Sequence, residues 1–100
     1  MQTILLNNLS QLEHICRQHR VKRLYAFGSV CTNKFNDKSD IDLIIAFEQR
    51  YFSGYVNNFF SLESKLKKLF KRDIDLVAEE TIQNPYFKKI INKTKVVVYE

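Results

Sequence analysis

Residues 40–47 read Asp-Ile-Asp-Leu-Ile-Ile-Ala-Phe. After the two aspartates every position is apolar, which is typical of a strand covered on both faces. Because side chains alternate along a strand, Asp40 and Asp42 are expected on one face, about 7 Å apart along the backbone. Like charges this close repel each other unless a cation lies between them, and magnesium prefers one or two carboxylates together with phosphate oxygens. The stretch therefore predicts a central strand that begins in a candidate metal site.

Another strand precedes this stretch and ends in a turn. Residues 23–27, Arg-Leu-Tyr-Ala-Phe, are rich in strand formers and stop at Gly28. A glycine lets the backbone come close to a ligand, and Ser29 offers a hydroxyl and an amide to phosphate oxygens. The sequence has no Gly-x-x-x-x-Gly-Lys-Ser/Thr pattern, so this turn is not a Walker P-loop. Residues 30–39 are polar and predict the loop between the two strands.

A later acidic strand is predicted at residues 73–78, Asp-Ile-Asp-Leu-Val-Ala. If it lies beside the strand of residues 40–47, either Asp73 or Asp75 joins the first pair of carboxylates. Three carboxylates could hold two metal ions for an in-line displacement at phosphorus. Reaction at phosphorus rests mainly on positioning and charge stabilisation, so it needs no cysteine or serine nucleophile.

The remaining elements follow from apolar periodicity and from helix start signals. Ser10 to Glu13 reads as a capping box at the start of a helix over residues 10–19, with earlier turns from Ile4 as an option. The other predicted elements are a long helix over 54–70, a short helix capped by Thr81 or Asn84 with Pro85 in its first turn, and a closing strand over 95–99. The order helix, strand, strand, helix, strand, helix, strand predicts an α/β (α+β) fold with helices packed on a mixed sheet.

The composition is that of an ordinary globular protein, with 45% hydrophobic and 27% charged residues. The longest apolar stretch is broken by Asp42 and is far too short to cross a membrane. The N-terminus carries no secretory signal pattern, and Cys16 and Cys31 read as free thiols, so we expect a cytoplasmic protein. His14 and His19 are five residues apart on the first helix, a poor spacing for two ligands of one metal, and both are expected at the surface.

The net charge of +5 implies an affinity for anions without identifying one. A basic run lies on or just after the long helix, which also carries apolar positions, and it is best interpreted as a solvated outer face: Lys65, Lys67, Lys68, Lys71 and Arg72. We therefore expect no nucleic-acid ligand. Aromatic residues before and at the start of that helix are candidates for a partner surface: Tyr51, Phe52 and Tyr55.

These spaced motifs resemble the nucleotidyltransferase superfamily that includes DNA polymerase beta and the kanamycin-type antibiotic adenylyltransferases. The smallest branch is the most similar, the minimal nucleotidyltransferases that are often encoded beside an all-helical partner as toxin–antitoxin pairs. The resemblance is carried by residues 24–29 (Leu-Tyr-Ala-Phe-Gly-Ser), residues 39–43 (Ser-Asp-Ile-Asp-Leu) and residues 75–77 (Asp-Leu-Val). It extends over nearly the whole chain, so residues 1–100 are expected to form one domain with the mixed-sheet nucleotidyltransferase fold.

The resemblance implies catalytic roles for Asp40, Asp42 and Asp75. Asp40 and Asp42 would be metal ligands, and Asp75 would be the third ligand or the general base, because Leu-Val follows it as in the family pattern. Gly28 and Ser29 would contact the nucleotide phosphates. The implied metal is Mg²⁺.

The implied reaction moves a nucleoside monophosphate, AMP from ATP, to a hydroxyl acceptor on a small helical protein partner and releases pyrophosphate. A non-catalytic module that sequesters such a partner is the alternative. Val30 stands where the family often has an arginine, and Asn33 stands where it often has a glycine. Whether turnover survives Val30 in place of the arginine is left open. The nucleotide preference, the acceptor and the oligomeric state, a homo-oligomer included, are left open.

Overall fold

A four-stranded mixed sheet lies at the centre of the computed structural model, which describes residues 2–49 and 52–100. The strand order is β3-β2-β1-β4. The strands are β1 (Val21–Phe27), β2 (Ile41–Phe47), β3 (Ile74–Ala78) and β4 (Val96–Tyr99). β1 pairs antiparallel with both β2 and β4, and β2 pairs parallel with β3. The predicted mixed sheet, with the strand of residues 40–47 inside it, is therefore confirmed.

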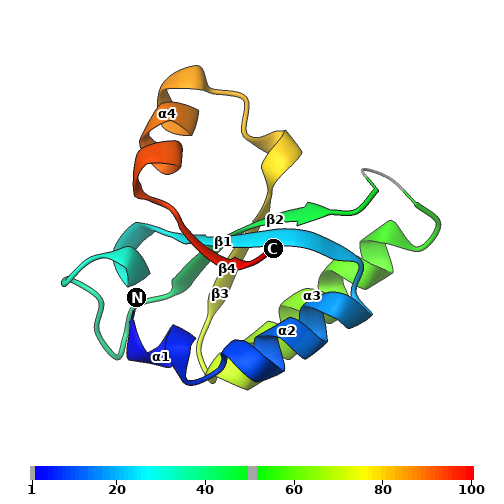
Figure 1. Cartoon of the computed structure of the whole chain (residues 1–100), viewed down its shortest axis with the longest axis horizontal. Coiled ribbons are helices and arrows are strands. Elements are labelled where there is room, and N and C mark those ends of the chain that lie inside the picture. The colour runs from blue at the N-terminus through cyan, green and yellow to red at the C-terminus, as the bar shows by residue number, and fades with distance from the viewer. Residues whose placement is uncertain (1, 50–51) are drawn as a thin grey trace.

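Helices lie on both faces of this sheet. The α-helices are α1 (Thr3–Leu6), α2 (Leu9–Gln18), α3 (Tyr55–Phe70) and α4 (Pro85–Thr94), and two short 3₁₀ helices are η1 (Gly28–Cys31) and η2 (Glu79–Thr81). α2 and α3 run side by side on one face, and α4 arches over the opposite face (Figure 1). The predicted order of major elements is confirmed. No helix in the described ranges is long and apolar enough to cross a membrane.

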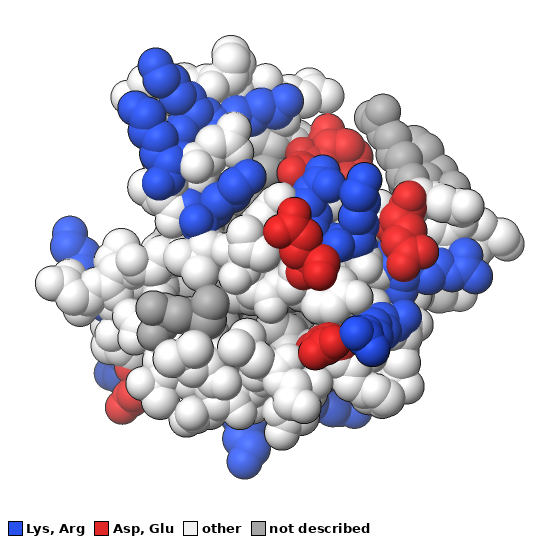
Figure 2. All heavy atoms as spheres, in the orientation of Figure 1, with Lys and Arg blue, Asp and Glu red and all other residues white. Residues whose placement is uncertain are grey.

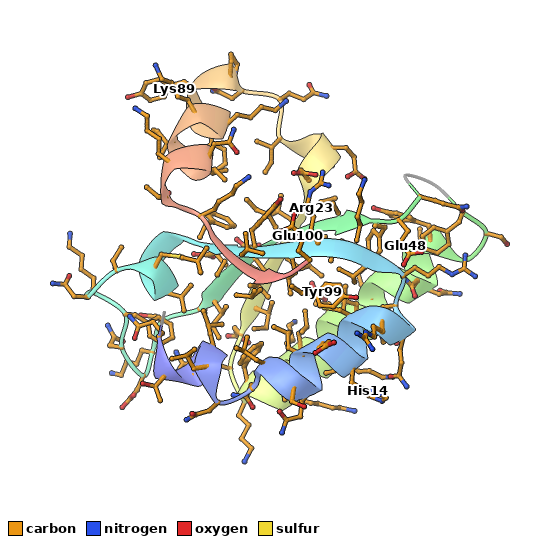
Figure 3. All side chains as sticks on the ribbon, in the orientation of Figure 1. His14, Arg23, Glu48, Lys89, Tyr99 and Glu100 are labelled. Atoms are coloured by element: carbon orange, nitrogen blue, oxygen red, sulfur yellow. The ribbon has the colours of Figure 1, made fainter. Side chains whose placement is uncertain are left out.

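The alternation of side chains along the strands divides the core into two clusters. The larger cluster lies between the sheet and helices α2 and α3 and includes Leu24, Leu43 and Ile45. The smaller cluster lies under α4, where Tyr25 and Ile44 face the other way. Asp42 is two residues before Ile44 on the same strand, so it belongs to the α4 face. The carboxylates of the predicted site therefore lie on the face that the smaller cluster covers. Figure 3 shows the side chains on both sides of the sheet.

The predicted capping box at the start of the first long helix is wrong. α2 begins at Leu9 with Asn8 as the N-cap residue, and in this part of the chain no side chain caps it. The amide of Leu12 donates to the carbonyl of Asn8 at 2.9 Å, and the side-chain amide of Asn8 donates back to the carbonyl of Ile4 at 2.7 Å. Because the turn of α1 already leads into α2, Ser10 lies inside the helix, where it has no free amide to cap.

The start of α4 follows the predicted pattern. Asn84 is the N-cap residue, and its side-chain oxygen accepts hydrogen bonds from the amides of Tyr86 at 2.9 Å and Phe87 at 3.2 Å. Pro85 takes the first helical position, where its missing N–H costs nothing. Of the two predicted caps, Asn84 and not Thr81 is therefore the one used.

His19 is buried, and its predicted place at the surface is wrong. Only 4% of the residue is exposed. Its Nδ1 lies 2.7 Å from the carbonyl oxygen of Ile15, and its Nε2 lies 3.0 Å from Oγ of Ser61 on α3. The side-chain amide of Asn58, also on α3, donates to the carbonyl of His19 at 2.8 Å. α2 itself thus supplies the partner of Nδ1, and packing of α3 against α2 supplies the partners of Nε2 and the carbonyl oxygen. His14 is exposed as predicted.

We expect His19→Ala to lower the free energy of unfolding by about 2 kcal/mol, because it opens a cavity and leaves Ser61 without its partner. His14→Ala is the matched control on the same helix and should change stability by less than about 0.5 kcal/mol. Urea denaturation of the two variants and the wild type measures both values. Equal stability of the two variants would contradict the structural role of His19.

The two cysteines behave as packing residues. Cys16 is fully buried, and burial raises the pKa of its thiol to about 12. Cys31 is half-buried, its thiol donates to the carbonyl of Ala26 at 3.3 Å, and burial is also the main cause that raises its pKa. Both thiols are free in the described structure, as predicted, and neither is a reactive thiolate at neutral pH.

Candidate active site

Asp42 and Asp75 lie side by side on neighbouring strands. In the parallel pairing of β2 with β3, Ile41 is opposite Ile74 and Asp42 is opposite Asp75. The two isoleucines are buried in the larger core cluster, so the two aspartates point to the other face of the sheet. The apolar pairing on one face therefore fixes the acidic pair on the other.

Electrostatic coupling links this pair to Asp40. Asp42 is partly buried, and its pKa is raised, first by burial, then by the charge of Asp75, then by that of Asp40. Asp40 and Asp75 are exposed. Asp73 lies just before β3, and its backbone carbonyl accepts a hydrogen bond from the amide of Ile41 at 3.1 Å. Of the two candidates for the third carboxylate, the structure thus places Asp75 opposite Asp42.

The donor set at this place fits a divalent cation that also binds phosphate. Asp42 and Asp75 offer hard carboxylate oxygens whose mutual repulsion a cation would relieve. Within residues 2–49 and 52–100 no group of three His, Cys, Asp or Glu side chains is close enough to hold a metal ion by itself. Magnesium commonly takes only one or two protein carboxylates and completes its shell with water and phosphate oxygens. The pair therefore fits a metal that arrives with a nucleotide, and the ligand roles remain predictions.

Gly28 is required by the position of Asp42. Its φ of 72° lies in the left-handed region, which favours glycine. A Cβ atom at this residue would overlap the carboxylate oxygen Oδ2 of Asp42. Phe27, the preceding residue, is opposite Asp42 in the pairing of β1 with β2. The Gly-Ser turn and the acidic strand are thus in direct contact, and Ser29 follows at the start of η1.

Val30 cannot take the place of the family's usual arginine as a phosphate contact. Only 1% of the residue is exposed, and it belongs to the larger core cluster. The position therefore serves packing in this chain. Asn33 is exposed in the loop that follows.

Arg72 holds the loop that leads to Asp40. Its guanidinium donates to the carbonyl of Ser39 at 2.8 Å and to that of Asn36 at 3.1 Å, and it lies 4.5 Å from the centre of the Phe35 ring. The exposed lysines of the same basic run confirm the predicted solvated face, but Arg72 does not belong to it. The sequence signal for its role is its place directly before the Asp-Ile-Asp strand that pairs with β2.

We expect Arg72→Ala to destabilise the chain by about 1 kcal/mol, because two hydrogen bonds are lost. The amides of residues 32–40 should exchange faster with solvent, because the loop that leads to Asp40 is no longer held in place. Lys68→Ala removes a positive charge from an exposed position and is the control. Hydrogen exchange followed by mass spectrometry separates the two variants, and equal protection of residues 32–40 in both would refute the role of Arg72.

Comparison with known proteins gives the same family as these motifs. Residues 10–100 match the family model described as polymerase beta, nucleotidyltransferase. A protein of Methanocaldococcus jannaschii, named as a candidate protein adenylyltransferase, is 34% identical over 93% of this chain and 100% of its own length.

Solved structures agree with the fold. A candidate minimal nucleotidyltransferase has a TM-score of 0.75 at 24% identity, over 92% of this chain and 90% of that chain. A chain from the complex of tri-AMPylated Shewanella oneidensis HEPN toxin with MNT antitoxin has a TM-score of 0.64 at 16% identity, over 95% of this chain and 71% of that chain. With the family model matching residues 10–100, this chain belongs to the polymerase beta nucleotidyltransferase family and is a nucleotidyltransferase.

Proposed function

We propose that this chain transfers AMP from ATP to a hydroxyl group on a protein acceptor, in a reaction that depends on a divalent cation. The main support is the pairing of Asp42 with Asp75 beside Gly28, since two adjacent carboxylates at a glycine turn suit a metal-bound triphosphate. The name of the Methanocaldococcus jannaschii relative supports AMP and a protein acceptor, as does the AMPylated toxin in the Shewanella oneidensis complex.

In this proposal the acidic residues hold the metal and handle the proton. Asp42 and Asp40 would be ligands, and a divalent cation bound there would stabilise negative charge on the phosphate oxygens. Ser29 would donate its hydroxyl and amide to the phosphates. The acceptor oxygen bonds to the α-phosphorus, the bond from that phosphorus to the bridging oxygen breaks, and pyrophosphate leaves. Asp75 is exposed beside Asp42, so it can accept the proton of the attacking hydroxyl or complete the metal site.

Transfer of label from two forms of ATP tests this proposal. The chain is incubated with magnesium, with an extract of its source cells and with ATP labelled at either the α- or the γ-phosphate. We expect label on protein from α-labelled ATP alone, and none in the presence of EDTA. Asp37→Asn makes the same chemical change at an exposed aspartate in the preceding loop, and it is the control for Asp40→Asn/Asp42→Asn. Label from γ-labelled ATP would indicate a kinase reaction instead, and labelling that survives in Asp40→Asn/Asp42→Asn would contradict the site.

A module that binds and sequesters a protein partner is the second candidate. Large apolar side chains are exposed on two helices, Val56 and Phe60 on α3 and Tyr86 on α4. Tyr51 lies outside the described residues. Phe52 and Tyr55, the other predicted partner residues, are half-buried, with ring centres 6.0 Å and 5.3 Å from that of Phe47.

The two candidate functions predict different behaviour of one double variant. If the chain acts by sequestration, Asp40→Asn/Asp42→Asn should still neutralise its partner when both are produced in the same cell. If it acts by transfer, the double variant should bind the partner without neutralising it. The double variant Val56→Ser/Phe60→Ser changes the exposed surface on α3 and leaves the acidic site intact. Loss of neutralisation in this variant, with neutralisation retained in Asp40→Asn/Asp42→Asn, would indicate sequestration through that surface.

A further inference from the structure

A pocket of about 360 Å³ lies between α4 and the sheet, on the face that carries Asp42 and Asp75. Its floor is apolar and buried and consists of Tyr25, Ile44, Ile82 and Ile91. We call it the α4 pocket. Cavities of this size and lining are typical of small-molecule sites, whose few polar groups fix the orientation of the ligand.

The α4 pocket is adjacent to the acidic pair along the sheet. Ile44 follows Asp42 by two residues on β2, so their side chains share one face about 7 Å apart. Tyr25, opposite Ile44 on β1, extends the floor away from the carboxylates. If the phosphates of a nucleotide lie at Asp42, its base, at the other end of the molecule beyond the sugar, would therefore reach the α4 pocket.

The rim of the pocket is polar. Asn92 is exposed, and its side-chain oxygen accepts a hydrogen bond from Nζ of Lys95 at 3.0 Å. The same ammonium lies 4.1 Å from the centre of the Tyr25 ring. Lys88 and Glu80 also line the rim, and Figure 2 shows lysine side chains gathered over α4. The rim thus offers an amide and charges of both signs above an apolar floor.

We propose that the α4 pocket holds the adenine ring of ATP, a proposal that rests on the nucleotidyl transfer proposed above. One face of the base would lie on this floor of Tyr25, Ile44, Ile82 and Ile91, where apolar contact is favourable. Asn92 carries a donor and an acceptor on one planar group, the pattern that pairs with N6 and N7 of adenine. Its carbonyl oxygen has a second lone pair, so the bond from Lys95 does not exclude this pairing. Guanine presents O6 where adenine presents its amine, so the same amide would discriminate between the two bases.

Methyl NMR of isoleucine-labelled protein tests where the base lies. Magnesium with ATP should shift the methyl signals of the floor residues Ile44, Ile82 and Ile91 through the ring current of the base. The methyls of Ile41 and Ile45 face α2 and α3 and serve as controls in the same spectrum. Magnesium with tripolyphosphate, which has no base, should leave all five signals unchanged or shift only Ile41 slightly, since it flanks Asp42.

Two variants on α4 and a control on the same helix test recognition by titration calorimetry. We expect Asn92→Ala to bind ATP about tenfold more weakly and to lose its preference for ATP over GTP. Lys88→Ala should also weaken the binding of ATP. Lys89→Ala should not, because Lys89 points away from the sheet (Figure 3) and does not line the pocket. These substitutions are at exposed positions, so the fold should be retained.

The outcomes separate this proposal from the proposed function. Binding of ATP that is lost in Asp42→Asn but shifts none of the floor methyls would overturn the adenine pocket and leave nucleotidyl transfer standing. Floor shifts with an unchanged ratio of ATP to GTP affinity in Asn92→Ala would overturn the role of that residue in recognition. No binding of any nucleoside triphosphate by the wild type would overturn both proposals.

Discussion

Asp42→Asn is expected to lower AMP transfer by about a thousandfold, since a bound metal supplies several kcal/mol of charge stabilisation at phosphorus. The substitution keeps the size of the side chain and removes the charge that would hold the cation. The measurement is the rate at which label from α-labelled ATP appears on protein at saturating magnesium and ATP. Asp37→Asn, with the same chemical change in an exposed loop, should retain wild-type activity. A variant at position 42 with more than a tenth of that activity would remove Asp42 from the site.

The same substitution should raise the stability of the metal-free protein at neutral pH. The pKa of Asp42 is raised above its ordinary value of 3.8, so the folded state favours the protonated carboxyl. The contribution of Asp42 to the free energy of unfolding is therefore fully present below pH 3.8. It is lost as the pH rises through the pKa of the folded state, because the carboxylate must then ionise beside Asp75 and Asp40.

Thermal denaturation in EDTA from pH 3 to pH 8 tests this difference between the proteins. The wild type and Asp42→Asn should have similar midpoints at the acid end, and the variant should have the higher midpoint at neutral pH. Magnesium should raise the midpoint of the wild type alone. A variant less stable than the wild type at every pH would show that the carboxylate serves the fold.

Gly28→Ala is the second change with a large expected effect. The left-handed backbone at Gly28 costs an alanine about 1–2 kcal/mol, and the overlap of the new Cβ with Asp42 adds about 1–3 kcal/mol. Transfer should be lost as well, because the carboxylate must move to make room.

Gly54→Ala provides the matched control for this change. Gly54 has a similar φ of 82°, but a Cβ there would meet nothing within 4 Å. It therefore carries the cost of the backbone conformation without the overlap. Urea denaturation of both variants isolates the contact with Asp42 as the difference between them. Equal losses of stability in the two variants would mean that Asp42 moves aside freely.

The sequence was sufficient for elements whose signal is local. The apolar run after Asp42 predicted a central strand because alternation and burial depend only on neighbouring residues. Asn84 and Pro85 predicted a helix start for the same reason, since a cap and its amides lie within three residues. The choice between Asp73 and Asp75 was not local. It depends on the register of β3 against β2, which brings Ile74 opposite Ile41.

Interactions between distant residues account for the errors at His19 and Arg72, whereas the wrong capping box at Ser10 has a local cause in the turn of α1 that leads into α2. His19 reads as a surface residue until α3 brings Ser61, 42 positions away, to its ring. Arg72 reads as part of a basic run until its guanidinium meets carbonyls 33 and 36 residues earlier. Neither partner has a sequence signature, because a backbone carbonyl is available at every residue and a serine hydroxyl at many. Such contacts become visible only once the helices and loops are packed.

α4 has few buried residues, and this affects how the helix moves. Within residues 85–94, all of them described, Ile91 is the one buried residue, whereas α3 buries Leu62, Leu66 and Phe70. A helix with so little buried apolar surface opens at a lower free energy than the rest of the fold. In the ligand-free protein the amides of α4 should therefore exchange with solvent sooner than those of α2 and α3. A molecule held between α4 and the sheet would slow that exchange, so the helix would act as a lid whose closure reports occupancy.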